Sequence, residues 1–224
     1  MGLDMVPMGK PQPGFEKRYT QIIRIIEGSE KQELSFFDKL KGKKLLSKED
    51  LLKEWFANQI PAYEAIKAPR VGRDQEADEW LKQKYLESDK TVSEALFIME
   101  NDGYYVVELA KELDGVPVYI TMNHDRNVFR GEFMQGCIDL IGEELVAEAW
   151  NTKMADATLD YGNRLMVVAD KIAEENNLQY LKSQRMPPEE ATEDSIEWKL
   201  HIVYSLAKWL IFYGKNGHGY EADY

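Results

Sequence analysis

The sequence predicts a mainly α-helical protein, a single-domain bundle of six or seven helices with a short β-hairpin near 104–121 and an extended N-terminal arm. Apolar residues recur at spacings of three and four over most of the chain, which is the period of an amphipathic helix. Capping residues precede several of these segments. With 224 residues, 44% of them hydrophobic, the chain can bury one large core. We therefore expect residues 1–224 to form one domain.

The first third is expected to hold an arm and two helices. Residues 1–14 contain three prolines and three glycines, which exclude a continuous helix and predict an extended arm. Residues 15–28 have helical spacing and a closing glycine. Residues 29–47 lack a sustained period and are expected to be a loop or a short frayed helix. Ser47 and Asp50 form a variant of the capping box for a second helix, which ends before Pro61.

The middle of the chain begins with the clearest linker, residues 61–73, which contain two prolines. Asp74 can cap a helix that extends through Tyr85, and Thr91 with Glu94 makes a capping box for the next helix. Two β-rich runs then flank the turn dipeptide Asp114-Gly115, which favours a hairpin over 104–121. The residues of 104–113 also fit helical spacing, so strand and helix both stay open for that run.

The last hundred residues carry the strongest helical signal. An apolar face runs from Phe129 to Ala149 despite three glycines, and another runs from Met154 to Ile172. The short joint between them predicts an antiparallel helix pair. Residues 191–213 are apolar over most of the helix circumference, and glycine-rich residues 214–224 are expected to form a mobile tail.

We expect these three C-terminal helices to form the stability core. Phe133 and Leu206 are expected among its buried side chains, so that truncating either should unfold much of the protein. Removing residues 1–13 should cost far less.

Charge is distributed unevenly. Residues 1–73 carry 14 Lys+Arg against 10 Asp+Glu, whereas residues 74–224 carry 14 against 30. The overall charge of −12 disfavours nucleic acid and anionic membranes, unless a partner uses the local lysines. These candidate binding residues are Lys39, Lys41, Lys43 and Lys44. The single Cys137, an N-terminus without an apolar signal core and the lack of a membrane span predict a cytoplasmic protein.

Two polar groups are weak candidates for catalysis. The first is the triplet of His124, Asp125 and Arg126, which follows a β-rich run; alternatively, Asp125 or Asn127 caps the next helix. The second is His201 with Ser205, which lie on one helical stripe with Asp194 and Glu197 before them and Lys208 after them. That stripe either lines a polar cleft or faces water.

Metal and cofactor binding are not expected. The three histidines lack metal-ligand spacing, and the carboxylates near 143–160 are interpreted as a solvated face. The glycine-rich segment 214–219 follows a helix and lacks the strand-to-helix context of a phosphate loop.

Without a convergent catalytic set, the sequence favours an acidic, soluble interaction protein. An immunity or inhibitor protein that masks a basic partner is one example. The alternative is a small-molecule enzyme that uses His124 or His201 as an acid or base in a polar cleft. The oligomeric state stays open.

Overall fold

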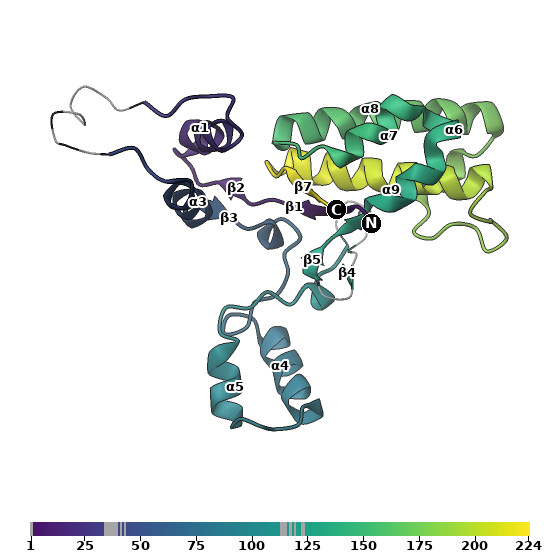
Figure 1. The fold of residues 1–224 in the computed structure, drawn as a ribbon. Coiled ribbons are helices and arrows are strands. Elements are labelled where there is room, and N and C mark those ends of the chain that lie inside the picture. The colour runs from purple at the N-terminus through teal and green to yellow at the C-terminus, as the bar shows by residue number, and fades with distance from the viewer. Residues whose placement is uncertain are drawn as a thin grey trace. The chain divides into compact units, whose positions relative to one another are not determined.

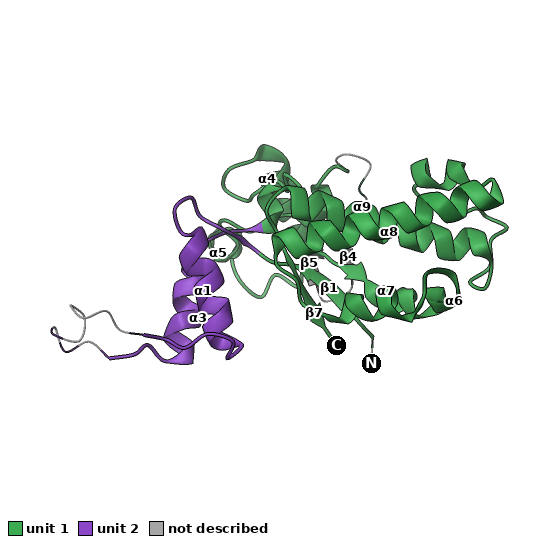
Figure 2. Ribbon diagram, turned by 90° about the horizontal axis from the view of Figure 1, so that it is seen from above, with its two compact units in different colours: residues 1–8, 62–224 green, residues 9–61 purple. Residues whose placement is uncertain are grey.

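The computed structural model describes residues 2–33, 40, 42, 44–112, 116, 118, 120–121 and 124–224. The mainly α-helical class with a short hairpin is confirmed. The chain divides into two compact units, residues 1–8 with 62–224, and residues 9–61 (Figure 2). Charge follows this division, because residues 9–61 carry 11 Lys+Arg against 8 Asp+Glu, and the larger unit carries 17 against 32.

The larger unit is built on two long antiparallel helices, α8 (Ala155–Asn176) and α9 (Ile196–Lys215), which lie side by side (Figure 1). Glycines allow their close approach. A Cβ added at Gly214 would lie 2.7 Å from the backbone nitrogen of Leu159, and one at Gly162 would lie 3.0 Å from the backbone nitrogen of Ile211. The sequence instead predicted an antiparallel pair of 129–149 with 154–172, because only a short connection joins these two segments.

Shorter elements surround this pair. They are β1 (Asp4–Pro7), β4 (Ile120–Thr121), β5 (His124–Asn127), β6 (Phe129–Arg130), α6 (Ile138–Ile141), α7 (Glu143–Ala147), β7 (Tyr220–Asp223) and 3₁₀ helices at 62–64, 107–109, 131–137, 148–150 and 179–183. The hairpin β4–β5 overlaps the predicted region only at residues 120–121, and its second strand lies beyond it. The predicted turn at 114–115 lies outside the described residues. Residues 107–109 of the ambiguous run are helical.

A three-stranded antiparallel sheet joins the two ends of the chain in the order β6-β1-β7. Met5 lies between Phe129 and Ala222 and is fully buried, as is Leu3. The N-terminal residues are therefore extended, but they belong to the core.

The expectation of a mobile tail over 214–224 requires correction. Tyr220 is fully buried and donates a hydrogen bond through its hydroxyl to the carbonyl of Glu148 at 3.1 Å. The His218 Nδ1–H donates to the carbonyl of Met8 at 2.9 Å. The glycine-rich composition of the tail suggested mobility. The pairing of β7 with β1 could not be predicted, because β1 lies at the other end of the chain.

The predicted six-turn helix over 129–149 is also wrong. The segment is broken into β6, a 3₁₀ helix, α6 and α7. Gly142 has a φ of 86°, which a continuous α-helix cannot contain. As a result, Phe133 is 45% exposed and lies outside the core, whereas Leu206 is fully buried as predicted.

The smaller unit pairs two helices, α1 (Glu16–Ile26) and α3 (Lys48–Ala57), with a short ladder of β2 (Lys10–Pro11) and β3 (Gln59–Ile60). Tyr19 stacks on Trp55 with ring centroids 5.0 Å apart. Ser47 caps α3 by accepting a hydrogen bond from the backbone nitrogen of Asp50, as the sequence predicted.

A helical arm, residues 69–106, leaves the main core and returns to it. It holds α4 (Gln75–Glu87) and α5 (Glu94–Glu100), which lie side by side (Figure 1). Val71 closes its base by exchanging backbone hydrogen bonds with Gly103 and Tyr104. Ser93, and not the predicted Thr91, caps α5. The predicted linker 61–73 thus supplies one side of the arm's base.

Burial predicts which truncations matter. Met5→Ala should lower the free energy of unfolding by about 2–5 kcal/mol, because it leaves a cavity under the central strand. Phe133→Ala should cost below about 1 kcal/mol, because nearly half of that side chain is in water. Urea unfolding of both variants checks this order, and a larger loss for Phe133→Ala would contradict it.

Close packing of α8 and α9 gives a second prediction. Gly214→Ala places a methyl group against the Leu159 backbone and should destabilise the protein by about 1–3 kcal/mol. Gly136→Ala is the matched control, since a Cβ there meets nothing within 4 Å. Thermal midpoints of both variants measure the effect; equal midpoints would show that the helices can separate without cost.

Candidate functional site

Helix α9 brings His201 and Ser205 together in the interior. The side chain of Ser195 caps the helix through the Trp198 backbone nitrogen, and the two residues then lie one turn apart. The His201 Nε2 atom is 3.4 Å from the Ser205 Oγ atom. The residues are only 5% and 3% exposed. The predicted pair therefore exists, but it lines no solvent-exposed face.

Positive groups surround this pair. Lys208, one turn further along, donates from Nζ to the carbonyl of Lys182 at 3.0 Å, and Arg185 forms an ion pair with Glu112. Burial, with Lys208 and Arg185, lowers the pKa of His201 to about 4. Burial also lowers the pKa of Lys208, and Glu112 opposes that shift. The imidazole is therefore neutral near pH 7.

The pair lacks the third member of a catalytic triad. In the described part of the chain, the His201 Nδ1 atom has no hydrogen-bond partner, whereas a triad holds that nitrogen with a carboxylate. A histidine with its pKa near 4 is also a weak base at neutral pH. Asp194, the first acid of the predicted stripe, is exposed and precedes the helix. The geometry favours a buried packing role.

The other predicted residues lie partly outside what is described. The backbones of His124, Asp125 and Arg126 form β5, so Asp125 is within a strand and does not cap a helix. Their side chains are outside the described part. Lys39, Lys41 and Lys43 also lie outside the described residues. Lys44 is described and exposed.

Some of the carboxylates near 143–160 take part in an ion-pair network that was not predicted from the sequence. The Glu148 carboxylate accepts hydrogen bonds from the Nη1 and Nη2 atoms of Arg164, each at 2.6 Å, and the Lys153 Nζ atom lies 3.1 Å from Glu148 Oε2. These hydrogen bonds, with Arg164 first, lower the pKa of Glu148 to about 2. Arg164 also binds Asp160 at 2.8 Å. Among the described residues, no group of three or more His, Cys, Asp or Glu could hold a metal ion.

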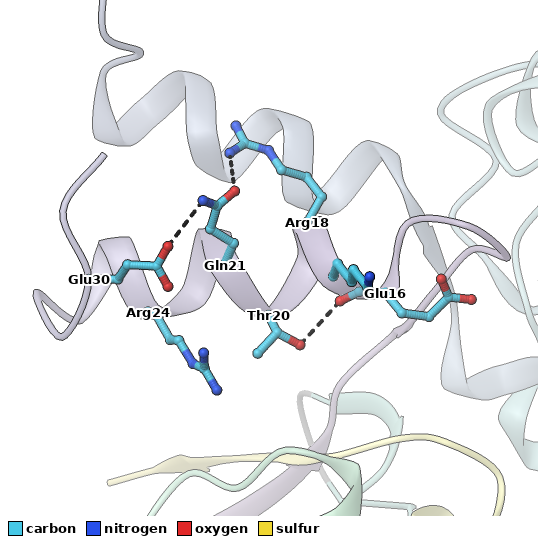
Figure 3. A pocket seen from close by; sticks show the side chains of 7 residues that line it. Glu16, Arg18, Thr20, Gln21, Arg24 and Glu30 are labelled. Atoms are coloured by element: carbon cyan, nitrogen blue, oxygen red, sulfur yellow. Dashed lines mark hydrogen bonds between the residues drawn. The ribbon is translucent and has the colours of Figure 1, made fainter. Parts of the chain in front are cut away.

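A shallow pocket lies along the polar side of α1 (Figure 3). Its lining is of mixed charge, with Arg18 and Arg24 beside Glu16 and Glu30. Arg18 is engaged by Glu54 and Gln21, and Gln21 donates in turn to Glu30. Because charges of both signs line the pocket and Arg18, Gln21 and Glu30 are engaged with one another or with Glu54, the pocket indicates no particular ligand.

The outer face of α5 is the feature that sequence reasoning missed. Leu96 and Met99, one turn apart on α5, are 36% and 66% exposed, whereas Phe97 and Ile98 pack against the arm. The sequence marks this region by its charge, because residues 91–110 contain four carboxylates and no Lys or Arg.

Comparison with protein-family models, curated proteins and solved structures found no match. Of the helices in the described ranges, none combines the length and the apolar character needed to cross a membrane.

The depressed pKa of His201 links stability to pH. The unfolded chain has the ordinary histidine pKa near 6.5, so between about pH 4 and 6.5 it binds more protons than the folded state. Stability from the neutral imidazole is thus full above pH 6.5 and is lost as pH falls toward 4.

We expect His201→Gln to remove about 1–3 kcal/mol of this pH dependence, measured by urea unfolding across that window. Ser205→Ala is the control, because it keeps the buried imidazole and should keep the wild-type slope. A wild-type slope in His201→Gln would place the titration elsewhere.

Proposed function

We propose that this protein binds and masks a basic protein partner, as an immunity or inhibitor protein does. The observation that carries the proposal is a set of exposed carboxylates on the helical arm that have no ion pair with any described residue. Glu94, Glu100 and Asp102 are exposed, and within the described ranges none of them has an ion pair.

Three carboxylates around α8 differ from those of the arm because they are paired. Glu148 and Asp160 bind Arg164, and Asp170 binds Lys182 at 2.8 Å. Paired charges of this kind support the fold and present little net field to a partner. The unpaired arm carboxylates can instead attract a basic surface and speed its association.

The alternative, an enzyme that uses His124 or His201, is supported less well. His201 and Ser205 are buried, and no described carboxylate orients the imidazole. A cytoplasmic location also belongs to the proposal. Its support is the single Cys137, whose thiol is buried with a pKa raised to about 12 by burial.

Affinity capture with the full chain tests the proposal. The tagged protein is incubated with extract of its source cells, alongside an unrelated acidic protein of equal net charge. We expect a stoichiometric partner with a pI above about 9, retained only by this chain and released by about 1 M salt. An acidic partner, a salt-resistant partner, or none retained beyond the control would contradict the proposal.

A further inference from the structure

Helix α5 has apolar residues on both of its sides, although only one side has a partner in the fold. Within its seven residues, the five from Ala95 to Met99 are apolar. Phe97 packs against Tyr85 of α4 with ring centroids 5.5 Å apart. Leu96 and Met99 project from the opposite side and are exposed. A helix that is apolar all round is normally covered on every side.

The arm has only a small core of its own. Four buried side chains form it, separate from the main core, namely Val71, Ala77, Leu81 and Val106. Trp80 covers its edge by stacking on Tyr104 and by donating a hydrogen bond from Nε1 to Glu108 at 2.9 Å. Two short helices bury little apolar surface, so a third helix on α5 would add to the packing of the arm.

Charge selects the kind of helix. Glu100 lies one turn after Leu96 and so adjoins the exposed pair, Asp102 follows the end of the helix, and the nearest basic residues in sequence are Lys90 and Lys111. Because this surface is negatively charged, it repels nucleic acid and anionic bilayers. A helix with Lys or Arg flanking a Leu-rich face matches both its apolar centre and its acidic rim.

We infer that the outer face of α5 docks a basic amphipathic α-helix from the protein partner. Its apolar side chains lie on Leu96 and Met99, and its cations face Glu100 and Asp102. Methionine suits this role because its flexible, polarisable side chain adapts to different apolar surfaces. The inference rests on the proposed function and specifies which element of the partner is recognised.

The test uses a synthetic peptide of about 16 residues, with leucines at helical spacing and lysines elsewhere. Titration into the full chain should show saturable binding, detected by calorimetry. Leu96→Ser with Met99→Ser should weaken binding at least about tenfold, and Glu100→Lys with Asp102→Lys should do the same. Circular dichroism and thermal midpoints confirm that the variants stay folded.

Matched controls use α8. Val167→Ser removes a side chain that is 69% exposed, and Glu174→Lys with Glu175→Lys makes the same charge change on exposed positions. Each should change affinity less than about twofold. A peptide of the same composition with the leucines out of helical spacing should bind at least about tenfold more weakly.

Each contrary result has a distinct meaning. Equal affinity of wild type and the Leu96/Met99 variant overturns docking on α5, while a basic partner found by capture would still support the proposed function. Absence of peptide binding also overturns the inference. A wild-type dimer in sedimentation that becomes monomeric in the Leu96/Met99 variant would make a second copy the occupant, which overturns it too.

Discussion

The close contact of α8 and α9 is the constraint on which the larger unit depends. At Gly162 and Gly214 each helix lies against the other with no room for a side chain. This approach places Trp209 and Tyr213 of α9 in the centre of the unit, with their ring centroids 4.7 Å apart. Tyr220 completes the cluster by packing its ring near Trp209. The sheet and the short helices are thus arranged around one helix pair.

Among the described carboxylates of the larger unit, those around Glu148 are paired with cations, whereas Glu94, Glu100 and Asp102 of the arm have no ion pair. Around Glu148, cations meet carboxylates of the same unit, and Lys153 and Arg164 also lie over the ring of Tyr161. Burial keeps the imidazole of His201 neutral, so this side chain needs no counter-ion. Both arrangements use polar groups to support packing. The arm instead presents the carboxylate of Glu100 beside the exposed side chains of Leu96 and Met99.

The sequence predicted correctly the elements that depend on neighbouring residues. It did not predict the elements that depend on contacts with residues far away in the chain. Ser47 caps α3 because the cap and the helix are neighbours in the chain. Residues 129–149 were misjudged because Arg130 and Phe129 pair with Asp4 and Met5 of β1, which draws the start of the segment into a sheet, and Gly131 then lies against Leu3. The His201–Ser205 proximity follows from helical spacing, but their burial does not. No spacing rule identifies Arg164 as the partner of Glu148, since 16 residues separate them.

The position of β1 has a consequence for biosynthesis. Met5 pairs with Ala222, a residue that the ribosome adds more than 200 positions later. At about 5–20 residues per second, the strand waits roughly 10–40 seconds for that neighbour. Its apolar side chains and one free edge are open to other chains throughout this interval. Nascent copies of this protein are therefore vulnerable to aggregation until translation of β7, and chaperones that shield extended apolar segments should act on the N-terminal residues.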